Sequence, residues 1–143
     1  MNIKFFKIVK SSLLMVLVCS NVYANTDYFN EGLNLYNKNK FEKAKFKFEQ
    51  DLVFNPKSEN SYLYLSKIFN RQDKKKLEEQ NLNSVILLNP KNEDAIYSLS
   101  KLKLEKSDYK ASQKLVDQLL IICKNFCEKS KILKNEIEKS LKK

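Results

Sequence analysis

Residues 25–58 read NTDYFNEGLNLYNKNKFEKAKFKFEQDLVFNPKS and contain Gly32, the only glycine of the chain, and Pro56, one of its two prolines. The other proline, Pro90, has the same place in residues 59–92 that Pro56 has in residues 25–58. Residues 93–126 form a third unit of the same length. A fixed period of about 20 to 50 residues is typical of repeat proteins, in which each unit packs on its neighbours. We therefore expect a stack of similar units.

The first unit carries particular residue types at particular places. The aromatic residues Tyr28 and Phe41 precede the small residues Gly32 and Ala44 by four and three positions, and Pro56 lies near the end of the unit. With this pattern the unit resembles the tetratricopeptide repeat, a helical-hairpin family whose period is about 34 residues. The resemblance implies two antiparallel helices in each unit, which approach closely at the two small residues.

The ends of the expected helices carry residues that suit such places. Proline has no backbone N–H to donate, so Pro56 and Pro90 are expected to end second helices. Asn55, directly before a proline, is expected to be extended. In the third unit, Ser107 and Asp108 are expected to cap the second helix.

The second unit departs from the pattern at Glu78. This glutamate occupies the small, buried position of the second helix. Because a buried unpaired carboxylate is costly, we expect either a shift in the register of that helix or a place for Glu78 at the edge of the stack.

Residues 127–143 are expected to form one more helix. Leu133, Ile137 and Leu141 recur every four residues and give it a narrow apolar stripe. A repeat stack needs such a polar-backed element to cover its end. The expected fold is therefore all-α: an α-solenoid of three tetratricopeptide-like helical hairpins with a C-terminal capping helix, preceded by a signal peptide. An ordinary helical bundle is the alternative that the same periodicity permits.

Residues 1–24, MNIKFFKIVKSSLLMVLVCSNVYA, have the three parts of a secretory signal peptide. Three lysines precede a short apolar run, and Val22-Tyr23-Ala24 matches the small-x-small pattern of a cleavage site. The run is shorter than the roughly 20 apolar residues that span a bilayer. We expect export, most simply to a bacterial periplasm. A lipid anchor on Cys19 and an uncleaved membrane anchor are the alternatives.

Cleavage after Ala24 would leave two cysteines, Cys123 and Cys127. An even number of cysteines in an oxidising compartment favours a disulfide. This disulfide could constrain the turn after the third unit, where no proline follows. Two free thiols or a redox pair are the alternatives.

Composition argues against an enzyme. The chain has no histidine, which removes Ser–His and Cys–His catalysis and the usual zinc ligand sets. A single glycine is too few for a glycine-rich phosphate loop. We therefore expect no catalytic activity, no metal and no cofactor.

The resemblance implies a partner-binding groove, because the first helices of successive tetratricopeptide units line a concave surface that binds peptides or protein segments. Carried over by position, the lining residues are Phe29, Leu33, Tyr36, Asn37, Leu63, Lys67, Asn70, Arg71, Tyr97, Lys101 and Leu104. The implied function is a non-catalytic protein–protein interaction scaffold or adaptor in the bacterial envelope, whose partner is another protein or a peptide segment of acidic character. The alternative is that these residues only pack between neighbouring units.

The charge of the chain keeps a second class of function open. Lys and Arg number 27 against 17 Asp and Glu, a formal net charge of +10. This charge also suits a cationic envelope protein that associates with anionic polymers or a membrane surface. Because lysines alternate with glutamates, most charges are expected on solvated faces. Nucleic acid is not an expected partner, since an exported protein seldom meets it.

Overall fold

The computed structural model describes residues 27–142, and within that range it contains α-helices and no strand. The helices are α2 (Tyr28–Asn37), α3 (Phe41–Phe54), α4 (Glu59–Arg71), α5 (Lys75–Leu88), α6 (Glu93–Glu105), α7 (Tyr109–Ile122) and α8 (Cys127–Leu141). The expected signal peptide, residues 1–24, lies outside the described residues. No helix in the described part of the chain is both long enough and apolar enough to cross a membrane.

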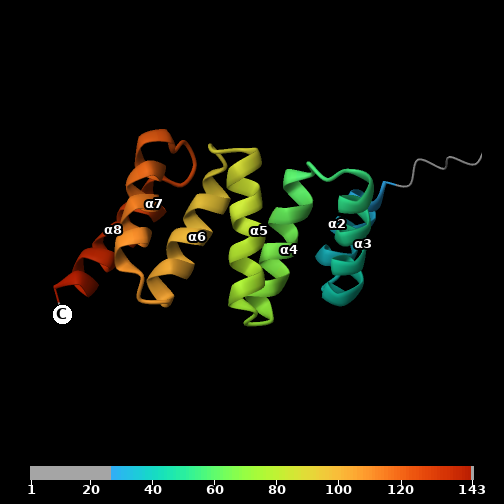
Figure 1. Cartoon of the computed structure of the whole chain (residues 1–143), viewed down its shortest axis with the longest axis horizontal. Coiled ribbons are helices and arrows are strands. Elements are labelled where there is room, and N and C mark those ends of the chain that lie inside the picture. The colour runs from blue at the N-terminus through green and yellow to red at the C-terminus, as the bar shows by residue number, and fades with distance from the viewer. Residues whose placement is uncertain (1–26, 143) are drawn as a thin grey trace, which may run out of the picture.

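The helices stack side by side in chain order (Figure 1). The pairs α2–α3, α4–α5 and α6–α7 form antiparallel hairpins, and α8 packs on α7 and touches α6. The second helices α3, α5 and α7 therefore all end on one edge of the stack, while the turns inside the hairpins lie on the opposite edge. The expected all-α helical repeat solenoid is confirmed.

The turns inside the hairpins share one backbone geometry. Asn39, Asp73 and Ser107 adopt positive φ angles of 56°, 53° and 59°, and they occupy the same position in the three successive units. Positive φ is costly for most residues, and the short polar side chains of Asn and Asp tolerate it best. Each hairpin thus turns the same way, so the helices recur in register.

The expected helix ends are also present. Asn55 and Asn89, which precede the two prolines, have extended φ angles of −130° and −138°. Asp108 caps α7, because its carboxylate accepts a hydrogen bond of 3.3 Å from the N–H of Ala111. Ser107 instead supplies the left-handed residue of the turn.

Gly32 allows a close approach, but to a different neighbour from the one expected. A Cβ atom at this position would lie 2.7 Å from the ring of Phe48, which is fully buried. The resemblance pointed to Ala44 as the facing residue. Ala44 is buried in the same cluster, and the ring of Phe48 makes the closest contact because it extends one turn of α3 further along.

The core consists of three clusters that join successive helices. One cluster joins α3 and α4, the second joins α4, α5 and α6, and the third joins α7 and α8. In α8, Leu133 and Ile137 are buried as the apolar stripe predicts. Leu141 is exposed, because it is the last residue of α8 and this end of the helix is directed away from the stack (Figure 1).

Glutamates at the starts of α4 and α6 bind the loops of the next unit. Glu59 accepts hydrogen bonds from the side-chain amides of Asn89 and Asn92. Glu93, its counterpart one unit later, accepts from the backbone N–H groups of residues 124, 125 and 126 at 2.9 to 3.0 Å. Desolvation raises the pKa of Glu93, but these three donors outweigh it and hold the pKa below its ordinary value.

Candidate functional site

A groove of about 430 Å³ runs along the first helices of the three units, and α5 contributes to its wall. Its lining is unusually rich in polar groups for a binding pocket. The lining residues are Tyr36, Ser66, Lys67, Asn70, Arg71, Glu78, Tyr97, Ser98, Lys101, Leu102 and Glu105.

Many of the residues that the sequence assigns to a partner-binding surface come together in this groove. They come from α2, α4 and α6, which lie far apart in the sequence and are each separated by a second helix. These residues are Tyr36, Lys67, Asn70, Arg71, Tyr97 and Lys101.

The other assigned residues do not line this groove. Phe29 packs against the rings of Phe48 and Tyr64, with ring centroids 5.8 and 5.9 Å apart. Leu33 and Leu104 are half-buried, and Asn37 is exposed at the end of α2.

Leu63 belongs to the core, which corrects its assignment to the groove. It is 8% exposed and packs with Leu82, Val85 and Leu99 among others. Tyr97 occupies the equivalent position one unit later and does line the groove. A leucine is shorter than a tyrosine and is covered by its neighbours at this position.

Two aromatic side chains give the groove flat apolar faces. Tyr36 is held edge-on between Phe41 and Tyr64, with ring centroids 5.3 and 5.0 Å away. Tyr97 packs against Phe126 at 5.4 Å. Because their neighbours fix them, both rings are already in place before anything binds, which lowers the entropy cost of binding.

The three cations of the groove differ in how far the protein neutralises them. The ammonium of Lys67 lies 2.6 Å from the carboxylate of Asp94. Arg71 lies over the rings of Phe41 and Tyr36, 4.7 and 5.9 Å from their centroids. Stacking leaves the N–H edges of a guanidinium free to bind a carboxylate.

Lys101 is the most available cation of the groove. It is exposed, and it forms no ion pair with any residue between 27 and 142. A ligand carboxylate would thus meet Lys101 and Arg71 without first displacing an internal partner.

Glu78 is a groove residue that the sequence argument did not find. Helix α5 begins at Lys75, which occupies the same repeat position as Phe41 at the start of α3, so the register does not shift. Glu78 stays at the small position, 4% exposed, and accepts a hydrogen bond of 3.0 Å from the amide of Asn70. Both expected outcomes, a shifted helix and an edge position, are therefore wrong. The helix keeps its register because Asn70 supplies the partner that a buried carboxylate needs.

The charge of Glu78 is disfavoured where it lies. Desolvation by burial raises the pKa of its carboxyl group, and the nearby charge of Glu105 acts in the same direction. The hydrogen bond from Asn70 and the charges of Lys75 and Lys101 offset only part of this effect. The wall of the groove thus contains a carboxyl group that is protonated more easily than a solvated one.

The two cysteines lie away from the groove, in the loop between α7 and α8. The structure joins Cys123 and Cys127 in a disulfide, with Cα atoms 5.3 Å apart. Glu93 binds the backbone of the same loop, so two independent links hold it. Among the described residues, no group of three or more Cys, Asp or Glu side chains is placed to hold a metal ion.

Several solved structures have a similar arrangement of stacked helical hairpins. The first tetratricopeptide domain of Spaghetti (RPAP3), bound to the HSP90 peptide SRMEEVD, matches with a TM-score of 0.73 and 15% identity over 81% of this chain and 91% of its own. The type III secretion chaperone SycD of Yersinia enterocolitica, in complex with a peptide of the translocator YopD, matches with a TM-score of 0.71 and 15% identity over 85% and 96%.

The Arabidopsis OM64 tetratricopeptide domain also matches, with a TM-score of 0.70 and 16% identity over 78% of this chain and 92% of its own. The chain has a tetratricopeptide-like fold. No protein-family model matches the sequence, and no curated protein is similar to it in sequence. The tetratricopeptide-like fold is thus recognised from its three-dimensional arrangement, and two of the structures described above contain a bound peptide.

Proposed function

We propose that this protein is a non-catalytic interaction scaffold that holds a segment of another protein in the groove along α2, α4 and α6. The observation that carries the proposal is that one groove contains two tyrosine rings held in place by their neighbours, Tyr36 and Tyr97, together with the cations Arg71 and Lys101. Peptide-bound structures of similar fold support it.

The charges of the groove indicate what kind of segment it binds. Lys101 and Arg71 favour carboxylates on the ligand, and the tyrosine rings favour apolar or aromatic side chains beside them. Glu78 and Glu105 add acceptors for a donor group on the same ligand. We therefore infer a segment that combines acidic residues with at least one large apolar residue.

Selection from a random peptide library displayed against the purified chain tests this proposal. Enrichment of acidic peptides with apolar anchors is expected. Tyr97→Ala should weaken a selected peptide about 30-fold, the scale of a buried aromatic anchor. Lys101→Gln should weaken it about two- to fivefold, the scale of an exposed charge pair.

Two exposed residues outside the groove provide matched controls. Phe46→Ala and Lys110→Gln remove an aromatic ring and a charge from α3 and α7. Affinity should be unchanged in both. Equal loss in the groove variants and the controls would show that the selected peptides bind elsewhere.

We also propose that the protein acts in the bacterial envelope after removal of residues 1–24. The basis is the three-part pattern of that segment. Expression in a bacterium followed by fractionation should give a periplasmic protein whose N-terminal residue is Asn25. A mature protein that retains residues 1–24, or that begins at Cys19 with the added mass of a lipid, would contradict this cleavage.

A further inference from the structure

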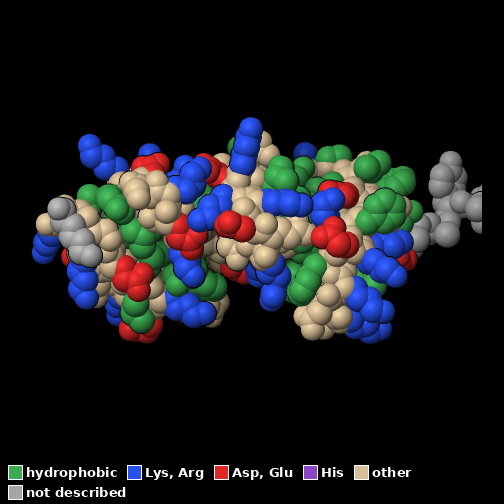
Figure 2. Space-filling model, turned by 90° about the horizontal axis from the view of Figure 1, so that it is seen from below, with side chains coloured by type: hydrophobic (Ala, Val, Ile, Leu, Met, Phe, Trp, Pro, Cys, Tyr) green, Lys and Arg blue, Asp and Glu red, His purple; other side chains and the backbone are tan. Residues whose placement is uncertain are grey.

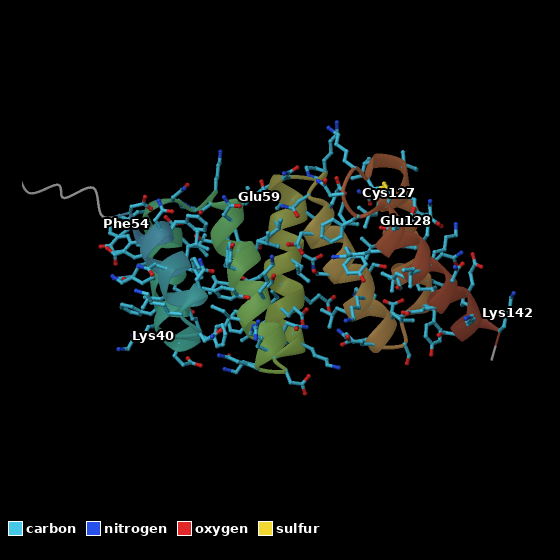
Figure 3. The ribbon with its side chains drawn as sticks, turned by 180° about the vertical axis from the view of Figure 1, so that it is seen from behind. Lys40, Phe54, Glu59, Cys127, Glu128 and Lys142 are labelled. Atoms are coloured by element: carbon cyan, nitrogen blue, oxygen red, sulfur yellow. A yellow bond between two sulfur atoms is a disulfide. The ribbon has the colours of Figure 1, made fainter. Side chains whose placement is uncertain are left out.

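The edge of the stack at which the second helices end carries a row of exposed aliphatic side chains. Val53, Leu87 and Ile121 occupy equivalent repeat positions in α3, α5 and α7, and are 75%, 83% and 86% exposed. We call these three residues the aliphatic row. Figure 3 shows this edge, with Phe54, Glu59 and Cys127 along it and Lys40 towards the opposite one.

Exposed large apolar side chains are concentrated at this edge. Single exposed aliphatic residues are ordinary on protein surfaces, whereas apolar residues gathered in one region mark contact surfaces. Phe54 and Leu88, which directly follow two members of the row, are exposed as well. Packing does not explain the row, because the side chains that fill the clusters lie elsewhere on the same helices.

Lysines accompany the row in the loops that follow each second helix. Lys57, Lys91 and Lys124 are all exposed. None of the three forms an ion pair within the part of the chain that the structure describes. Each unit therefore presents the same combination at this edge, one exposed aliphatic side chain and one exposed lysine that forms no ion pair in the described part of the chain.

Four acidic groups near this edge are bonded within the protein. The carboxylate of Asp51 accepts a hydrogen bond of 2.5 Å from Ser61, and Glu59 binds Asn89 and Asn92. Glu93 binds three backbone N–H groups, and Glu128 pairs with Lys131 at 2.7 Å. These carboxylates keep their charge, but Asp51, Glu59 and Glu93 are half-buried, whereas Lys57, Lys91 and Lys124 are exposed and meet an approaching surface first.

We propose that this edge docks on an anionic lipid membrane, with the aliphatic row inserted at the level of the headgroups and the three lysines against lipid phosphates. Shallow insertion of apolar side chains beside lysines is how peripheral proteins bind such surfaces. The exposed lysines are complementary in charge to an anionic bilayer. The ends of α3, α5 and α7 lie along one edge of the stack, so a deformable membrane surface can contact all three. The proposal is independent of the groove.

Sedimentation of the full chain with lipid vesicles tests the proposal. Vesicles of phosphatidylcholine with an equal amount of phosphatidylglycerol are compared with vesicles of phosphatidylcholine alone. The triple variant Lys57→Gln, Lys91→Gln, Lys124→Gln should bind the anionic vesicles about a hundredfold more weakly, because each lysine near a charged surface contributes about fivefold and the three factors multiply. Added salt should weaken the wild type similarly.

The opposite edge supplies the matched charge control. Lys38→Gln, Lys76→Gln, Lys110→Gln removes the same charge from exposed lysines near the hairpin turns. Figure 2 looks onto that edge, where basic and acidic side chains are intermixed. This control should lose less than threefold. Equal loss in the two lysine triples would mean that net charge alone drives binding, and it would overturn the proposal.

The aliphatic row is tested separately. Val53→Gln, Leu87→Gln, Ile121→Gln should weaken binding to anionic vesicles at least tenfold, since glutamine is a good helix former and these side chains bury almost nothing in the folded chain. The control Phe46→Gln, Leu77→Gln, Ile132→Gln changes exposed apolar residues elsewhere on α3, α5 and α8. The apolar N-terminal segment is common to all variants, so differences between them report the edge.

Two further outcomes would contradict the proposal. Equal binding of the wild type and the Lys57, Lys91, Lys124 triple variant to the anionic vesicles would exclude anionic recognition by this edge. A wild type that is dimeric by sedimentation equilibrium and becomes monomeric only in the row variant would assign the row to a contact between copies. Tyr97→Ala should leave vesicle binding unchanged, so failure of the groove proposal and failure of this one are distinguishable.

Discussion

The second and third units use the same place in the fold for different chemistry. In the third unit, the hydroxyls of Ser100 and Ser112 each donate to the other residue's backbone carbonyl, at 2.8 and 2.7 Å, and both residues are buried. In the second unit the equivalent residues are Ser66 and Glu78. Ser66 donates to Leu63 in its own helix, and Glu78 turns to Asn70.

The difference between the two units shows what the close approach of the two helices in a hairpin requires. The helices approach closely when the facing groups are small or when each polar group finds a partner. The serine pair closes the third hairpin with internal bonds, whereas Glu78 lines the groove. The first unit uses neither solution and relies on Gly32 against Phe48. One backbone arrangement thus accepts an apolar, a reciprocal polar or a carboxylate contact.

The largest expected effect comes from filling the apolar contact of the first unit. Gly32→Val should lower the free energy of unfolding by about 3 kcal/mol, because the added side chain overlaps a fully buried ring. Chemical denaturation followed by circular dichroism measures this. Asn34→Val, at an exposed position of the same helix, controls for helix propensity. Similar losses in the two variants would show that the close approach to Phe48 is not limiting.

Breaking the serine pair should cost less. Ser112→Ala is expected to lower the free energy of unfolding by about 1 to 2 kcal/mol, since it removes the hydrogen bond from Ser112 to the carbonyl of Ser100 and the contact between the two hydroxyls. The double variant with Ser100→Ala should lose less than the sum of the single losses, because the two bonds form one unit. Ser140→Ala removes a similar bond from an exposed site of α8 and should be nearly neutral.

Neutralising Glu78 should have the smallest effect, and of opposite sign. Glu78→Gln keeps an acceptor for Asn70 and removes the buried charge, so the free energy of unfolding at neutral pH should rise by about 1 kcal/mol. In the wild type, burial raises the folded-state pKa, so the folded protein binds more protons than the unfolded one between the ordinary carboxyl pKa and the raised value.

The contribution of Glu78 to stability therefore falls as pH rises through that window. The same slope should be absent from the Glu78→Gln variant when unfolding is measured at a series of pH values. Glu78→Ser, which copies the third unit, should also lose the slope. A wild type and a Glu78→Gln variant with parallel pH profiles would contradict the raised pKa.

Much of the fold could be predicted from local signals that repeat. The repeat period and the helical hairpin are both indicated by the single glycine, the two prolines and the aromatic residues at matching places in the units. Each of these residues affects the structure at its own position, either through the backbone conformation it permits or through the space its side chain needs. The apolar stripe of α8 could be read in the same way at Leu133 and Ile137.

The rest depended on partners that lie far away in the sequence. Nothing in the spacing of Glu78 indicates that Asn70 reaches it across the hairpin. The pairing of Lys67 with Asp94 spans 27 residues and changes how much charge the groove presents. Leu63 shares its repeat position with Tyr97, and only side-chain length separates a core residue from a groove residue there.

Glu59 and Glu93, the glutamates that begin α4 and α6, affect which loop residues can be substituted without loss of the fold. They hold the outer loops through hydrogen bonds to Asn89, Asn92 and the main chain of residues 124–126. The side chains of Lys91 and Lys124 are therefore not needed to hold these loops in place. Substitutions there can accumulate without disturbing the helices. A variant chain could therefore exchange the outward chemistry of this rim while keeping the groove, so the two surfaces proposed above can be altered one at a time on one small scaffold.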